Sequence, residues 1–102
     1  MLINRHKAPI SFELGKLYRD LNRFDDAEKS YLDALNIYRK LAEKNPDPYL
    51  HNLAITQNNI GNLYINLTRF DDAEKAYLEA LNIYKKLAEK NPDAYLPDLA
   101  MT

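Results

Sequence analysis

The strongest constraint in the sequence is an internal repeat, because residues 14–56 recur without a gap as residues 60–102. Of these 43 paired positions, 31 hold the same amino acid, far more than shared helical patterning alone produces. A repeat period of about 20 to 50 residues is typical of stacked arrays, in which each unit buries its apolar face against its neighbours. The offset of 46 residues therefore predicts one domain with an N-terminal tail at residues 1–10 and repeats at residues 11–56 and 57–102.

The composition of the repeats favours helices over strands. The chain has no valine, seven isoleucines and three threonines against sixteen leucines, and it is rich in alanine, glutamate and lysine. Strands are enriched in β-branched residues, whereas leucine, alanine, glutamate and lysine favour helices. The absence of cysteine also excludes a disulfide framework and a cysteine metal site. We therefore expect an all-α fold.

Each repeat contains two helical patterns of about twenty residues. In the second pattern, apolar residues recur at spacings of three and four from Ala27 to Ala42, and the stretch Asp25-Asp26-Ala27-Glu28 predicts an N-terminal capping box. Asn45-Pro46-Asp47 predicts the end of this helix, because proline cannot donate to the helical ladder. Asp47 is then expected to cap the following helix, with Pro48 at its first position.

The two ends of the chain differ from its middle. The first helix of repeat one is expected to start near Pro9 and to be shorter than the others. Residues 93–102 match only the opening half of a further helix. The sequence therefore predicts four long helices and a C-terminal half helix.

Six residues at fixed spacing in each repeat resemble the tetratricopeptide repeat. They are Leu14, Gly15, Tyr18, Ala27, Tyr31 and Ala34 in the first repeat, and Ile60, Gly61, Tyr64, Ala73, Tyr77 and Ala80 in the second. The resemblance covers residues 11–102 and implies a right-handed α-solenoid of antiparallel helix hairpins. The small residues are expected to let paired helices approach closely while tyrosines fill the space between them.

The repeats also depart from the pattern that they resemble. The glycine that is usual in the turn between the helices is replaced by Asn22 and Thr68, and the unit of 46 residues is longer than the usual 34. The unit is similar to the long repeats of kinesin light chain. Those repeats open with Asn-Asn-Leu, and Asn58-Asn59-Ile60 resembles this opening.

Asparagines in the first helix of repeat two form the candidate binding face. Asn58, Asn62 and Asn66 recur one turn apart on a single face, although asparagine is a poor helix-interior residue. An amide offers both a donor and an acceptor to any peptide group, and the resemblance implies that these first helices line a concave groove for a peptide or a partner helix. The predicted groove residues are Phe12, Lys16, Arg19, Asn58, Asn59, Asn62, Ile65 and Asn66. A solvated polar face is the alternative interpretation.

Self-assembly is a second hypothesis, because arrays generally need about three repeats and polar terminal units. The predicted self-association surface consists of Tyr77, Leu81, Tyr84, Tyr95, Leu96, Leu99 and Met101. A chain whose head resembles its tail can stack on another copy or exchange helices across a turn. A further alternative is that the chain is a piece of a longer array.

The sequence offers no machinery for catalysis and no site for a cofactor or a metal. His6 lies in the tail, His51 occupies a position that Pro97 holds in the other repeat, and two glycines 46 residues apart cannot form a phosphate loop. The paired acids are predicted to be helix caps; they are Asp25, Asp26, Asp71 and Asp72. We therefore expect a non-enzymatic protein.

Net charge and hydropathy limit the classes of partner that we expect for the chain. The net charge is −1, so no long-range field attracts nucleic acid or anionic lipid. The first ten residues lack the apolar run of a signal peptide, and no later stretch approaches a membrane span. We expect a cytoplasmic protein that binds a protein or a peptide, other copies of itself included.

Overall fold

The computed structural model describes residues 5–91 as four α-helices in succession. The helices are α1 (Lys7–Asp20), α2 (Phe24–Lys44), α3 (Pro46–Asn66) and α4 (Phe70–Lys90). No strand occurs among these residues, so the expected all-α fold is confirmed. The half helix predicted for residues 93–102 lies outside the described residues.

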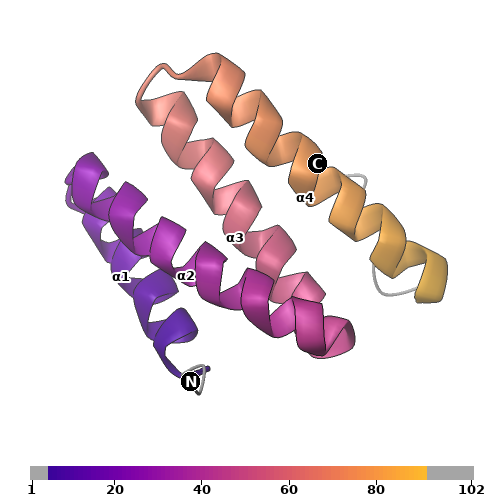
Figure 1. Ribbon diagram of the computed structural model, residues 1–102. Helices are drawn as coiled ribbons and strands as arrows, with labels where there is room; N and C mark the ends of the chain where they lie inside the picture. Colours follow the sequence, from indigo (N-terminus) through magenta and orange to yellow (C-terminus); the bar gives the residue numbers. More distant parts are fainter. Residues whose placement is uncertain (1–4, 92–102) are drawn as a thin grey trace.

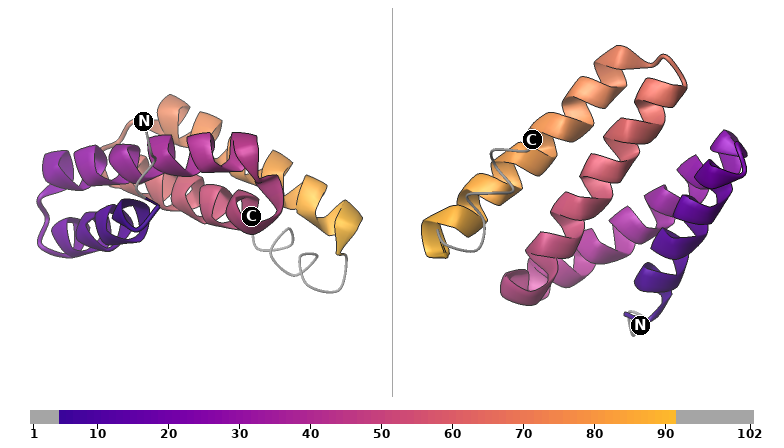
Figure 2. Two further views of the ribbon diagram at one scale, coloured as in Figure 1. Left: turned by 60° about the horizontal axis from the view of Figure 1, so that its bottom comes forward. Right: turned by 180° about the vertical axis from the view of Figure 1, so that it is seen from behind.

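The helices alternate in direction and pack on their neighbours in the chain (Figure 1). α1 packs on α2, α2 on α3, and α3 on α4. Seen from behind, α1 and α3 lie side by side with α2 beyond them, and α4 lies along the other side of α3 (Figure 2). The sequence therefore forms two stacked helix hairpins, and α2 is packed between α1 of its own repeat and α3 of the next one.

The core is built from the apolar stripe of α2 together with α3. Ala27, Tyr31 and Ala34 are fully buried, and they cluster with Ile60 and Leu63. The expectation that the tyrosines pack in the core is confirmed for Tyr31, Tyr38 and Tyr84, which are buried, while Tyr18, Tyr49 and Tyr64 pack at its edge.

Glycine allows the two helices of each hairpin to approach closely, as expected. A Cβ atom on Gly15 would lie 2.6 Å from Cδ1 of Tyr31, and one on Gly61 would lie 2.6 Å from Cε1 of Tyr77. Contacts under 3.0 Å do not occur for real Cβ atoms without a shift of their neighbours. The tyrosine rings therefore lie directly against the glycine backbone.

The predicted capping box is wrong. α2 begins at Phe24, its N-cap residue is Arg23, and no side chain caps the helix; α4 begins in the same way. The Nε atom of Arg23 instead donates to Asp26 Oδ2 at 2.8 Å, while the guanidinium lies 4.7 Å from the Tyr18 ring centre. Asp26 therefore pairs with the Arg23 guanidinium, which lies over the Tyr18 ring, and does not cap the helix. Its carboxylate still lies favourably near the positive end of the helix dipole.

α1 begins at Lys7, near Pro9, and is shorter than the other three helices, as predicted. The start of α3 differs from the prediction, because this helix begins at Pro46 with Asn45 as its N-cap residue and no side-chain cap. Asp47 therefore lies in the first turn, where it accepts a hydrogen bond from Lys90 Nζ at 3.0 Å. Proline suits this first position because its missing N–H would have no partner there.

The turn within each hairpin contains a residue with left-handed backbone. Asn22 has a φ of 60° and Thr68 a φ of 57°, at the positions where glycine is usual. Asparagine tolerates this region, whereas a β-branched threonine is strained in it. The backbone geometry thus explains why glycine is the expected residue there.

Candidate functional site

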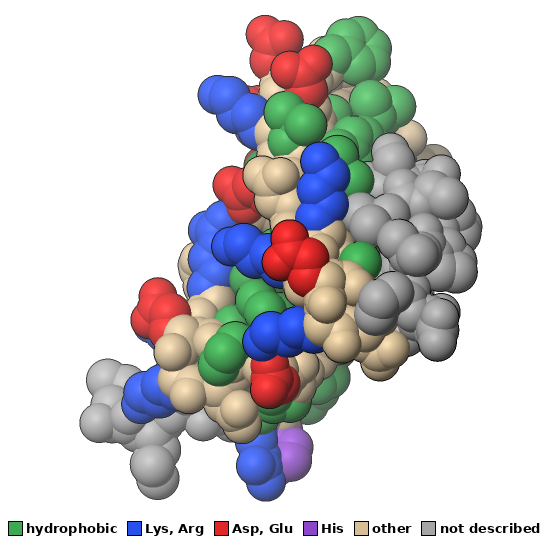
Figure 3. Space-filling view, turned by 90° about the vertical axis from the view of Figure 1, so that its right-hand side faces the viewer, with side chains coloured by type: hydrophobic (Ala, Val, Ile, Leu, Met, Phe, Trp, Pro, Cys, Tyr) green, Lys and Arg blue, Asp and Glu red, His purple; other side chains and the backbone are tan. Residues whose placement is uncertain are grey.

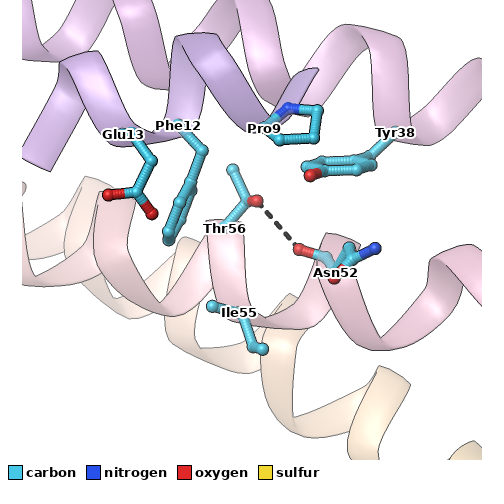
Figure 4. A pocket seen from close by; sticks show the side chains of 7 residues that line it. All are labelled: Pro9, Phe12, Glu13, Tyr38, Asn52, Ile55 and Thr56. Atoms are coloured by element: carbon cyan, nitrogen blue, oxygen red, sulfur yellow. Dashed lines mark hydrogen bonds between the residues drawn. The ribbon is translucent and has the colours of Figure 1, made fainter. Parts of the chain in front are cut away.

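A concave cavity of about 240 Å³ lies between the two repeats, with walls from α1 and α3 (Figure 4). Tyr38 of α2 contributes to one side of it. The lining residues are Pro9, Phe12, Glu13, Tyr38, Asn52, Ile55 and Thr56. Both first helices of the repeats therefore contribute to a single depression.

The walls of the cavity are held by contacts below it. The ring of Phe12 lies 5.7 Å from the ring of Tyr31, which is fully buried. On the opposite wall, Thr56 Oγ1 donates to the Asn52 carbonyl oxygen at 2.8 Å. Buried neighbours lock side chains into one rotamer, so the cavity is preformed on rigid helices.

A polar link joins the two walls about two turns along α1 and one turn along α3 from the cavity. Arg19 Nη1 donates to Asn59 Oδ1 at 3.4 Å, and Asn59 Nδ2 donates to the Ile55 carbonyl oxygen at 2.9 Å. Lys16 lies between the link and the cavity, with Nζ 3.6 Å from Glu13 Oε2 and 5.7 Å from the Phe12 ring centre. The groove floor therefore carries charges of both signs.

The eight predicted groove residues fall into different surroundings. Phe12 lines the cavity, Arg19 and Asn59 meet across the groove, and Asn58 and Lys16 are half-buried nearby. Asn62, Ile65 and Asn66 are exposed on α3. Asn62 is engaged by its own hairpin, because Tyr77 donates its hydroxyl hydrogen to Asn62 Oδ1 at 2.5 Å.

The prediction missed most of the cavity lining. Ile55 and Asn52 lie one and two turns before Asn59, respectively, on the same face of α3, so extending the asparagine face toward the start of the helix would have found them. Tyr38 lies on α2, and its place at the cavity follows only from how α2 crosses α1 and α3. No helical spacing connects it with the other lining residues.

The predicted self-association surface is only partly available in the described structure. Tyr77 and Leu81 are half-buried on α4. Tyr84 is only 7% exposed and packs with Leu87, so it belongs to the core rather than to an open surface. The other four predicted residues lie outside the described residues; they are Tyr95, Leu96, Leu99 and Met101.

The electrostatics of the described residues give no indication of chemistry. Burial raises the pKa of Tyr31, and burial also raises the pKa of Tyr77. Within residues 5–91 no group of three or more histidine, cysteine, aspartate or glutamate side chains could hold a metal ion.

The side on which α4 lies carries Lys and Arg interspersed with Asp and Glu, and hydrophobic side chains between them (Figure 3).

None of the four helices within residues 5–91 combines the length and the apolar character that a membrane span requires.

Two stacked hairpins joined through α2 and α3 define a helical-repeat protein. A family model described as tetratricopeptide repeat matches residues 13–86, which is 74 of the 102 residues. The chain therefore belongs to the tetratricopeptide-repeat family, whose members generally mediate protein–protein interactions and are typically non-enzymatic. No curated protein and no solved structure matches the chain. The similarity to kinesin light chain repeats stays a prediction.

Proposed function

We propose that the chain is an interaction module that holds an extended peptide segment of a partner protein in the groove between α1 and α3. The observation that carries this proposal is the cavity at the junction of the repeats, lined by Phe12 on one side and Ile55 on the other. It is walled by rigid helices rather than by loops, as a preorganised binding site requires.

The size of the cavity favours a peptide side chain over a small molecule. Small-molecule sites usually enclose about 300–1,000 Å³, whereas this cavity has about 240 Å³. That volume suits one apolar side chain of a peptide, with the Phe12 ring and Ile55 as its contacts. The rest of the peptide would then lie along the groove outside the cavity.

The polar residues along the groove suit a peptide backbone. Asn66 is exposed on α3, and Asn58 is half-buried on the same face. Each amide offers a donor and an acceptor, the two groups that a peptide bond needs. Lys16, Arg19 and Glu13 add both charges, which favours a peptide with mixed rather than uniformly acidic flanks.

The test selects binding peptides from a random display library and measures their affinity by fluorescence polarisation. Ile55→Lys puts a long charged side chain into the cavity and is expected to weaken binding at least tenfold, about 1.4 kcal/mol, because an apolar peptide side chain could enter only by displacing the lysine or desolvating its charge. Asn66→Ala is expected to weaken binding by about two- to fivefold through one lost hydrogen bond.

The matched control is Asn36→Ala, which removes an exposed asparagine from α2, outside the groove. It should bind the selected peptides like the unmodified chain. Circular dichroism melts confirm that each variant is folded. Peptides that bind Ile55→Lys as tightly as the unmodified chain would show that the groove is not the site.

A further inference from the structure

The junction between the two repeats is an apolar helix face of α3 packed on α2. Thr56, Ile60 and Leu63 are at most 2% exposed, and Leu67 packs at the edge of the same cluster. On α2 the cluster includes Tyr31 and Leu35, which are 0% and 4% exposed. These residues form the apolar contact by which the second repeat packs on the first.

α1 carries the same apolar face without a cover from the described residues. Ile10, Leu14, Leu17 and Leu21 are the equivalents, 46 residues earlier, of the four α3 residues, and they are 39–61% exposed. Spacings of four, three and four place them on one side of the helix. Three of these residues, Ile10, Leu14 and Leu17, line a hollow of about 380 Å³ together with Pro9 and Glu13. Contiguous exposed apolar faces mark interaction surfaces.

α4 carries the receiving face. Tyr77, Leu78 and Leu81 are the same residue types as Tyr31, Leu32 and Leu35 on α2. Leu78 is 51% exposed, and the other two are half-buried. The chain therefore presents, on helices at its two sides, both halves of the contact that joins its own repeats.

The charges at the rim of the junction are also repeated. Within the chain, Arg69 Nη1 lies 2.9 Å from Glu28 Oε2, and Arg39 Nη2 lies 3.0 Å from Glu79 Oε2. Shifted by 46 residues, these pairs become Glu74 with Arg23 of a second copy, and Lys85 with Asp33 of a second copy. Both pairs keep opposite charges.

One polar contact is not repeated. The hydrogen bond from Arg19 to Asn59 corresponds, after the same shift, to Ile65 facing Glu13 of a second copy. A contact between copies in this register would therefore lack one polar link that the junction within the chain has.

We propose that copies of this chain stack head to tail, with the α1 face of one copy on the α4 face of the next. The occupant is a second copy, because the apolar positions and both rim charge pairs continue the junction that exists inside the chain. The contact is heterologous, so it leaves one free α1 face and one free α4 face and extends into linear oligomers. The α1 face adjoins the groove at Pro9 and Glu13, but Leu17 and Leu78 lie outside the cavity lining, so variants at these leucines test stacking separately from peptide binding.

The test is sedimentation velocity and light scattering over a concentration series of the full chain. The unmodified chain is expected to pass from 11.9 kDa monomers to dimers and longer species. Leu17→Glu blocks the α1 face and Leu78→Glu blocks the α4 face, and each variant alone is expected to stay monomeric. Both leucines are half-exposed in the described structure, so both variants should fold.

Mixing the two variants distinguishes this arrangement from a symmetric one. Leu17→Glu retains its α4 face and Leu78→Glu retains its α1 face, so the mixture is expected to form one-to-one dimers and nothing larger. If Leu78→Glu alone dimerises, the contact joins two α1 faces and the proposal is wrong. A monomer at every concentration of the unmodified chain also overturns it.

A charge reversal tests the rim pair without touching the apolar faces. Asp33→Lys is expected to weaken association about threefold, and adding Lys85→Asp in the same chain should restore it, because exposed ion pairs have small effects. The control is Lys40→Asp, which changes an exposed α2 lysine that belongs to neither face. Equal weakening by Lys40→Asp, or no restoration in the double variant, would contradict the assigned register.

Discussion

The two repeats place equivalent residues in different surroundings. Leu63 is fully buried where α3 packs on α2, whereas its equivalent Leu17 is 51% exposed on α1. Conversely, Tyr31 of α2 is fully buried, whereas its equivalent Tyr77 of α4 is half-buried. Residue identity is the same in both pairs, so the difference comes from the neighbouring helix alone. In a stacked array, stability depends on the interface between units as well as on each unit.

The same comparison extends to the hydroxyl groups of these tyrosines. Tyr77 donates its hydroxyl hydrogen to Asn62, which faces it from α3. Lys16 stands at the position equivalent to Asn62, and the Tyr31 hydroxyl is buried with no hydrogen-bond partner among residues 5–91. A buried polar group without a partner is destabilising by about 1–3 kcal/mol. Repeat one therefore has the better packed ring and the less favourable hydroxyl.

The largest contrast is expected for the paired leucines. Leu63→Ala leaves a cavity in the core and should lower the free energy of unfolding by about 3 kcal/mol. Leu17→Ala removes a half-exposed side chain and should change it by less than about 0.5 kcal/mol. Urea unfolding followed by circular dichroism, at a concentration where the chain is monomeric, measures both. Similar losses in the two variants would mean that α1 is covered in solution.

A smaller and opposite effect is expected for the tyrosine hydroxyls. Tyr31→Phe removes the unpaired buried hydroxyl and should raise the free energy of unfolding by about 1 kcal/mol. Tyr77→Phe loses an exposed hydrogen bond to Asn62 and should lower it by no more than about 1 kcal/mol. Thermal melts of both variants give the sign of each change. A destabilised Tyr31→Phe would indicate a partner for that hydroxyl.

The loss of stability at alkaline pH is a further test of the surroundings of the Tyr31 hydroxyl. Burial raises the pKa of Tyr31, so above its unfolded-state pKa of about 10 the folded chain retains a proton that the unfolded chain releases. Stability is therefore fully present below about pH 10 and falls as the pH rises toward the folded-state pKa. The loss should be shallower in Tyr31→Phe than in the unmodified chain, as chemical denaturation across pH 9 to about pH 11 would measure. An unchanged slope would mean that Tyr31 ionises as readily in the folded chain as in the unfolded one.

The smallest contrast is expected at the two turns. Thr68 and Asn22 both have left-handed backbone, but threonine is strained there and asparagine is tolerated. Thr68→Gly should raise the free energy of unfolding by about 0.5–1 kcal/mol. Asn22→Gly should leave it nearly unchanged, because relief at the turn is offset by the greater freedom of glycine in the unfolded chain. Equal effects would mean that the threonine is not strained.

Helix content, helix order and the apolar stripes were predictable from local spacing. The close approach of paired helices at small residues was also predicted, but the pairing of Gly15 with Tyr31 came only from the structure. The helix starts were less predictable. The sequence Asp25-Asp26-Ala27-Glu28 satisfies the pattern of a capping box. In the structure Asp26 instead accepts a hydrogen bond from Arg23, whose guanidinium packs on the Tyr18 ring.

The candidate site was only partly predictable. The asparagine face of α3 follows from a helical spacing of four, and Arg19 does meet Asn59 across the groove. The cavity, however, lies toward the start of α3 and includes Tyr38 from a third helix. Its position depends on the angle at which α2 crosses α1 and α3, and no residue spacing encodes that angle directly.

Local information in the chain thus specifies two nearly identical helical hairpins, because helix propensity and apolar periodicity depend on near neighbours along the sequence. Which copy of each residue becomes core or surface was decided by tertiary packing. Leu63 is buried and Leu17 is exposed because α3 has α2 to pack against, and no described helix covers that face of α1. Burial is a property of the assembled neighbours, so identical sequences acquire different energetic roles.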